Sequence, residues 1–325
     1  MRRALFLAIL AVVLAAAGGP AADIPLPEHP RPGFQRAEWV NLNGPWRFRF
    51  DPRGAGERER WFDREPTAFD QTILVPFPWG SPLSGVADDG DVAWYGRRVR
   101  VPETWEGRRV FLCVGASDWR TTAWLDGQPV GTHQGGYTPF ELELTDVVSP
   151  GDEHRLILRV DDSPHPFKLE GKQGYGPARG LWQTVYLEAR PAAFVGSFEL
   201  RPDLAKEQVE VRVRLAEDAG EGTTVAFELD GGAGAVVHDG PIVPRGERMA
   251  RFAVPVPDPR VWSLEDPHLY DAAVLLRTPG GKDRVETYLG MREISTTRLP
   301  GHGHSYVALN RKPVYLQMAL DQGWH

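Results

Sequence analysis

Cysteine is almost absent from this chain of 325 residues, which contains a single one, Cys113. One thiol cannot form an intrachain disulfide framework or a cysteine-based zinc cluster, so both are excluded. Phe111, Leu112 and Val114 flank it, and we expect Cys113 to be a small buried side chain. The sequence also has no run of five or more Lys and Arg residues. In total, 37 Lys and Arg residues are outnumbered by 44 Asp and Glu residues. This acidic balance argues against a nucleic-acid partner, whose binding depends on neutralised phosphates.

Long apolar runs are also scarce, and the only one of note lies at the start of the chain. Met1, Arg2 and Arg3 precede an apolar stretch over residues 4–17, and small residues follow at 18–22. This pattern is typical of a secretory signal peptide, whose apolar part is too short to be a permanent transmembrane helix. We therefore predict a signal peptide over residues 1–22, a secreted or periplasmic protein, and no membrane partner after cleavage.

Amphipathic helical patterns are lacking as well, and short apolar or alternating runs bounded by Gly, Pro and Asp recur instead. Such runs are the signature of all-β folds. Residues 122–125 and 129–131 flank Asp126 and Gly127, which both tolerate positive φ, so this stretch predicts a hairpin.

A second group of candidate strands follows Pro191. Residues 209–215 alternate strictly, which predicts buried side chains at Val209, Val211, Val213 and Leu215. Strands at this spacing over about 100 residues predict a seven-strand immunoglobulin-like β-sandwich. We place one domain boundary near residue 190 and another near residue 297.

Tryptophan is concentrated in the part before residue 191, at Trp39, Trp46, Trp61, Trp79, Trp94, Trp105, Trp119, Trp124 and Trp182. Aromatic faces stack on sugar rings, so contact with carbohydrate is one interpretation. Core packing is the favoured one, since each tryptophan buries a large apolar area. We expect Trp182, which lies in an apolar strand, to be buried.

Several motifs follow one another along the chain: NLNGPWRF at 41–48, VPFPW at 75–79, WYGRR at 94–98, WLDG at 124–127, VGTHQGGYTPF at 130–140, RGLWQTVYLE at 179–188, VWSLEDPHLY at 261–270, LGMRE at 289–293 and LNRKPVYLQ at 309–317. In this order they resemble glycoside hydrolase family 2, which contains β-galactosidases, β-glucuronidases and β-mannosidases. The resemblance implies a jelly-roll sugar-binding sandwich over 23–190, an immunoglobulin-like sandwich over 191–297, and the truncated start of a catalytic (β/α)8 barrel over 298–325. Residues 306–325 would then form an unpaired apolar tail.

The same resemblance implies a function, the N-terminal non-catalytic part of an exported retaining β-glycosidase, β-galactosidase-like, that acts on β-linked glycosides in carbohydrate catabolism. Such enzymes use two carboxyl groups about 5–5.5 Å apart. In the family both follow the first barrel strand, so we expect no catalytic residue in this chain and no activity from it alone. A free-standing carbohydrate-binding module and a scaffold for oligomerisation are the alternatives, and a homo-oligomer is left open.

The loop before the motif at 179–188 is where the family's jelly roll contacts the substrate. Lys172 and Gln173 lie there and could hydrogen-bond sugar hydroxyls, although a solvated loop explains them equally well. Residues 171–174 lack the acidic residue of the well-known galactosidase pockets, which argues against a sodium-assisted galactose subsite. We expect Arg179 to form a structural ion pair or a domain contact.

Two further groups contain residue types that bind cations. Asp88, Asp89 and Asp91 lie in a glycine-containing loop, where a solvated turn is favoured over a cation site. His302 and His304 have metal-ligand spacing, but glycines flank them and no third ligand is apparent. We therefore expect no metal and no cofactor.

Overall fold

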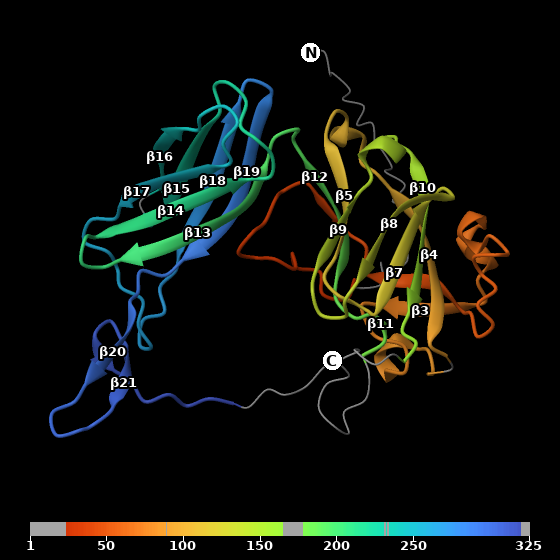
Figure 1. Cartoon of the computed structure of the whole chain (residues 1–325), viewed down its shortest axis with the longest axis horizontal. Coiled ribbons are helices and arrows are strands. Elements are labelled where there is room, and N and C mark those ends of the chain that lie inside the picture. Colours follow the sequence, from red (N-terminus) through yellow and green to blue (C-terminus); the bar gives the residue numbers. More distant parts are fainter. Residues whose placement is uncertain (1–23, 89, 165–177, 231, 233, 320–325) are drawn as a thin grey trace, which may run out of the picture.

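The protein is all-β, as predicted from the sequence. The computed structural model describes residues 24–319 except 89, 165–177, 231 and 233, so the predicted signal peptide lies outside the described residues. Figure 1 shows two β-sandwiches side by side and a small sheet beyond the second. The described helices are five short 3-10 turns, η1 (Trp61–Asp63), η2 (Pro66–Ala68), η3 (Pro82–Ser84), η4 (Glu103–Trp105) and η5 (Thr145–Val147). None of the helices in this described part could span a membrane.

The first sandwich consists of two antiparallel sheets and a short extra strand pair. The smaller sheet has the order β1 (Trp39–Asn41), β12 (Val185–Arg190), β5 (Arg109–Val114) and β9 (Phe140–Glu143). The larger sheet has the order β3 (Gln71–Val75), β2 (Gly44–Phe50), β4 (Val92–Arg100), β10 (Glu153–Asp161), β7 (Arg120–Leu125) and β8 (Gln128–Gln134). The extra pair is β6 (Ser117–Asp118) with β11 (Gly180–Leu181).

The core of this sandwich follows from alternation along its strands. In β2 the side chains of Trp46, Phe48 and Phe50 are buried, whereas Arg47 and Arg49 between them are half-buried. Six of the tryptophans are buried, which confirms core packing for Trp46, Trp61, Trp79, Trp94, Trp105 and Trp124. Most tryptophans of the first sandwich therefore stabilise its core.

Two local predictions for the first sandwich are confirmed. The hairpin between β7 and β8 turns at Asp126 and Gly127, whose φ angles are 49° and 85°. Cys113 of β5 is a free, buried cysteine. Burial raises the pKa of its thiol well above the ordinary value, so the side chain is a neutral core residue.

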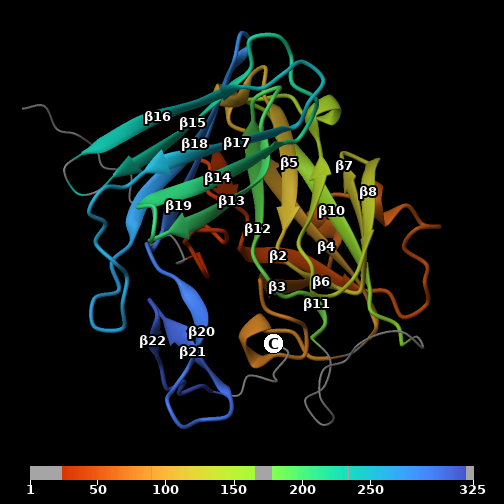
Figure 2. The same cartoon turned by 60° about the vertical axis from the view of Figure 1, so that its left-hand side comes forward.

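The second sandwich has the seven strands that the sequence predicts. One sheet has the order β13 (Val195–Asp203), β14 (Gln208–Leu215) and β17 (Met249–Pro255). The other has the order β16 (Ala235–Ile242), β15 (Thr224–Asp230), β18 (Tyr270–Thr278) and β19 (Gly281–Leu289). The four predicted residues of β14 are buried in its core, and Figure 2 shows the two sheets packed face to face.

The last described segment forms a three-stranded antiparallel sheet of β20 (Ile294–Arg298), β21 (Ser305–Leu309) and β22 (Lys312–Pro313). The expectation of an unpaired tail from residue 306 is wrong at its start, because Tyr306 pairs with Thr297. Beyond β22, Tyr315 and Met318 are 86% and 81% exposed, so these apolar side chains have no cover among the described residues. The barrel itself stays a prediction.

Candidate functional site

A cavity lies at the end of the first sandwich where the turn after β3 meets the end of β11. Its volume of about 540 Å³ falls in the usual range for small-molecule pockets. The cavity is lined by Leu26, Pro76, Phe77, Pro78, Trp79, Gly80, Ser81, Leu83, Asp88, Ala178 and Trp182. Lys172 and Gln173, the two substrate-binding residues predicted from the sequence, lie outside the described residues, close in sequence to Ala178.

One wall of the cavity is the turn that follows β3. The Ser81 hydroxyl accepts a hydrogen bond from the backbone N–H of Leu83 at 3.3 Å and caps η3. The N–H of Gly80 donates to the carbonyl of Val86 at 2.9 Å, which closes the turn. These bonds fix a loop that presents apolar side chains to the cavity, among them Leu83 with 64% of its surface exposed.

The cavity is also lined by Trp182, which follows β11. Its indole N–H donates to the carbonyl of Gly136 at 2.8 Å, and its ring meets that of Tyr137 edge to face at 5.4 Å. The expectation that Trp182 is buried is wrong: it is half-buried, because β11 ends at Leu181 and the next residue reaches the edge of the sandwich. An aromatic face held in this way is suited to stacking on a sugar or an apolar aglycone.

Gly180 is needed where β11 crosses the aromatic core beneath the cavity. Its φ is +76°, and a Cβ at this position would overlap the Tyr95 hydroxyl and the Trp79 ring. Trp79 is buried, and its indole N–H has no hydrogen-bond partner among the described residues. The floor of the cavity, next to Gly180 and Trp79, is thus closely packed.

An acidic rim, defined as Asp88, Asp91 and Asp162, surrounds Arg179 beside the cavity. The guanidinium Nε lies 3.4 Å from Asp88 and 3.7 Å from Asp162, and Nη1 bonds Asp91. Burial alone would lower the pKa of Arg179, but the hydrogen bond to Asp91 and the neighbouring charges raise it. The expectation of a structural ion pair for Arg179 is confirmed.

The rim carboxylates share one cation. All three lie within 3.7 Å of the Arg179 guanidinium. Asp88 is exposed, as expected for its loop, while Asp162 is fully buried. No cluster of metal-ligating side chains occurs among the residues that the structure describes. The cavity, with its aromatic and apolar lining, is suited to binding a small molecule.

The cavity residues are not marked as a set in the sequence. The VPFPW motif contains Phe77 and Trp79, and the RGLW motif contains Trp182. They meet in one cavity because the fold brings the turn after β3 and the end of β11 together (Figure 2). Ser81 and Leu83 carry no signal in the sequence beyond a proline-containing turn.

Comparisons with known proteins agree with this fold. The sugar-binding-domain model of glycosyl hydrolases family 2 matches residues 83–187, and a second model of glycosyl hydrolases family 2 matches residues 193–292. A beta-glucuronidase from Paenibacillus borealis is 26% identical over 286 residues, covering 79% of this chain and 46% of that protein. One from Felis catus is 24% identical over 331 residues, covering 88% of this chain and 48% of that protein. The chain spans about half the length of these relatives.

Solved structures show the same fold. A beta-glucuronidase from Ruminococcus gnavus in complex with uronic isofagomine superposes with a TM-score of 0.69 and 21% identity, covering 88% of this chain and 49% of that one. The two family models between them match more than half of the chain and lie on its two sandwiches. The chain therefore belongs to glycoside hydrolase family 2 and corresponds to the N-terminal portion of a family member.

Proposed function

We propose that this chain is the N-terminal, non-catalytic part of an exported retaining β-glycosidase that acts on β-linked glycosides. The observation that carries the proposal is the succession of two family 2 modules in a chain about half as long as its relatives. In this proposal the two catalytic carboxylates, about 5–5.5 Å apart in a retaining enzyme, belong to a part of the protein beyond residue 325.

The first sandwich would shape one side of the substrate pocket. Its cavity offers aromatic and apolar surface at Trp182 and Phe77. Arg179 beside it is ion-paired with the acidic rim. Lys172 and Gln173 would supply hydrogen bonds to sugar hydroxyls. Alanine at either position in the whole protein should raise KM more than it lowers kcat, and unchanged kinetics in both variants would remove them from the site.

Among glycosides, we propose a β-glucuronide rather than a β-galactoside as the substrate. The support is the names of relatives, since beta-glucuronidases are matched over 79–88% of this chain. A beta-galactosidase from Halalkalibacterium halodurans is matched over 62% of this chain. The test compares nitrophenyl β-glucuronide, β-galactoside and β-mannoside with the product of the whole gene, and preference for either neutral sugar would reject this assignment.

The non-catalytic role is tested with the 325-residue chain itself. We expect no release of nitrophenol from any of the three substrates above the rate of a mock purification. Turnover that follows the protein through every purification step would overturn the proposal. Export is tested separately, by sequencing the N-terminus of the secreted or periplasmic protein, which we expect to begin near residue 22 or 23.

A free-standing carbohydrate-binding module is the second candidate, and the cavity beside Trp182 favours it. Calorimetric titration of the 325-residue chain with the methyl β-glycosides of the same three sugars distinguishes the two. Saturable binding, together with a native protein whose mass equals that of a chain ending at residue 325, would support the module. A larger native protein with hydrolytic activity would support the glycosidase.

A further inference from the structure

The segment before β1 links the two sandwiches. Residues 24–38, here called the strap, run between them and are drawn in red in Figure 1. Asn41 and Asn43 of the first sandwich donate side-chain hydrogen bonds to the carbonyls of Leu26 and Pro25, both at 2.9 Å. Towards the second sandwich, Gln35 exchanges backbone hydrogen bonds of 3.0 and 2.8 Å with Glu286 of β19. The strap is thus bonded to both.

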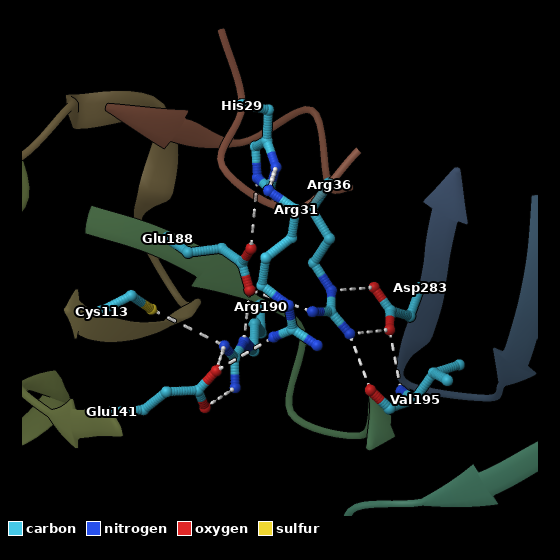
Figure 3. A network of polar contacts seen from close by, with 9 residues as sticks. All are labelled: His29, Arg31, Arg36, Cys113, Glu141, Glu188, Arg190, Val195 and Asp283. Atoms are coloured by element: carbon cyan, nitrogen blue, oxygen red, sulfur yellow. Dashed lines mark hydrogen bonds and ion pairs between the residues drawn. The ribbon is translucent and has the colours of Figure 1, made fainter. Parts of the chain in front are cut away.

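A charge cluster lies where the strap, β12 and β19 meet, as Figure 3 shows. It consists of Arg36, Glu141, Glu188, Arg190 and Asp283. Arg36 of the strap donates to both carboxylate oxygens of Asp283 at 2.9 and 2.8 Å and to Glu188 at 3.0 Å. Arg190 donates to Glu188 at 2.6 Å and to both oxygens of Glu141 at 2.7 Å. The side chains of Arg36, Glu188 and Asp283 are only 3–4% exposed, so the centre of this junction is nearly dry, whereas Glu141 lies at its exposed edge.

His29 of the strap completes the cluster as an uncharged group. Its Nδ1 accepts a hydrogen bond from the backbone N–H of Arg31 at 3.1 Å, which places the single ring proton on Nε2. Nε2 lies 3.9 Å from a Glu188 oxygen, beyond hydrogen-bond distance. A second proton has to go to Nδ1, where it would face the Arg31 N–H, so charging the ring breaks the bond that holds it.

The surroundings of His29 oppose a positive charge on the ring. The imidazole packs edge to face against Trp39 at 4.7 Å and Tyr186 at 5.6 Å between ring centres. The ionisable groups of the cluster and its borders are Arg31 and Arg36 of the strap, Glu188, Tyr186 and Arg190 of β12, Cys113 of β5, Glu141 of β9 and Asp283 of β19. Burial raises the pKa of Tyr186 and of Cys113, so both are neutral. Three arginines then balance three carboxylates without His29.

We propose that His29 and the charge cluster form an acid-sensitive lock that holds the strap between the two sandwiches. At neutral pH the ring is uncharged and the strap is docked. At acidic pH a protonated ring adds a fourth cation beside Arg31, Arg36 and Arg190, and its hydrogen bond to the Arg31 N–H is lost. Because Leu26 of the strap lines the cavity, release would also open one wall of the candidate site.

The direction of the pH effect follows from linkage. Burial lowers the pKa of His29 below its ordinary value of 6.5, more than the attraction of Glu188 raises it. The released strap therefore binds more protons than the docked strap in this region of pH. Docking is strongest above pH 6.5 and weakens as the pH falls through the window below it.

The single cysteine provides a reporter for the lock. Cys113 lies behind the cluster, with its sulfur 3.9 Å from Arg190, and it packs against Tyr186, which His29 covers. A thiol in solution reacts more slowly with disulfide reagents as the pH falls, because less thiolate is present. The experiment therefore follows the reaction of Cys113 with dithiodipyridine between pH 7.5 and 5, and divides its rate by that of glutathione in the same buffers. This ratio should rise severalfold at pH 5, as expected from the linkage of a single histidine.

The matched variants distinguish the effect of His29 titration from other effects of low pH on the protein. His29→Asn keeps an acceptor for the Arg31 N–H but does not titrate, so its ratio should stay flat over this range. His238→Asn, on edge strand β16, should behave like the unaltered protein. If His29→Asn already labels rapidly at pH 7.5, His29→Gln takes its place. A flat ratio in the unaltered protein, or an equal rise in the His29 variant, would overturn the lock.

A second measurement follows the ring itself. Proteins labelled at histidine Cε1 are titrated by NMR, and the resonance absent from the His29 variant is that of His29. The labelling ratio and this resonance should change with the same midpoint, below pH 6.5. Titration of His29 at or above that value with no change in Cys113 reactivity would also reject the proposal.

Discussion

Replacing Arg36 with alanine should destabilise the protein far more than removing an arginine from an exposed ion pair. The guanidinium makes four hydrogen bonds, two to Asp283, one to Glu188 and one to the carbonyl of Val195 at 2.8 Å. Its removal leaves Asp283 buried, with the backbone N–H of Val195 as its remaining partner among the described residues. Glu188 keeps Arg190, so most of the cost comes from the uncompensated Asp283 carboxylate.

The expected size of this effect is about 3–5 kcal/mol, the usual cost of removing one partner from a buried ion pair. With a urea dependence of about 2 kcal/mol per molar, the midpoint of unfolding should fall by about 2 M. Arg36→Lys keeps the charge but loses the planar fork, so its midpoint should lie between those of Arg36→Ala and the unaltered protein.

The assay is urea unfolding followed by circular dichroism at pH 7.5, with Arg98→Ala as the matched control. Arg98 also pairs with two carboxylates, Glu65 and Glu153, but all three side chains are about half exposed. Its removal should leave the midpoint nearly unchanged, because solvent screens exposed pairs. Equal midpoints for Arg36→Ala and Arg98→Ala would refute the reasoning that burial gives the cluster its strength.

Four further outcomes are expected. Gly180→Ala should cost about 2–5 kcal/mol in urea unfolding, because its added methyl group combines overlap with a left-handed φ; a stable variant would show that the floor of the cavity yields. Trp94→Ala, in the core, should cost about 3–5 kcal/mol, and Trp182→Ala clearly less, as circular dichroism during heating will show. Cys113 should resist iodoacetamide at pH 8 until urea unfolds the protein, and fast labelling of the native state would contradict its burial. In His29→Asn the loss of stability between pH 7 and pH 5 should be smaller than in the unaltered protein, since the lowered pKa of His29 removes stability as the pH falls.

Patterns confined to one strand or one turn can be predicted from the sequence. Residues 209–215 alternate with a period of two, and β14 buries Val209, Val211, Val213 and Leu215 as that period requires. Strands without such a pattern escape prediction. β16 lies at the edge of its sheet, exposes Val236 and Val237, and contains Gly240 and Pro241, so neither burial nor composition marks it.

The candidate site can be predicted only in part. The sequence indicates that Arg179 is a structural arginine, but its partner Asp91 lies 88 residues earlier, and only the fold brings the two together. The apolar neighbours of Trp182 predict a core position, yet β11 ends at the residue before it. In the charge cluster, Arg36 and Asp283 are 247 residues apart. The sequence around neither residue indicates that the other is its partner.

That separation also has a consequence for synthesis. The strap is among the first parts of the described chain to leave the ribosome, whereas Asp283 follows 247 residues later. At about 5–20 residues per second, Arg36 waits roughly 12–50 s for this partner. The first sandwich can fold during that interval, but the junction cannot close, and Glu188 and Arg190 emerge well before Asp283. A chaperone that binds nascent chains would therefore find the side of the strap that faces the second sandwich uncovered until that sandwich is almost complete.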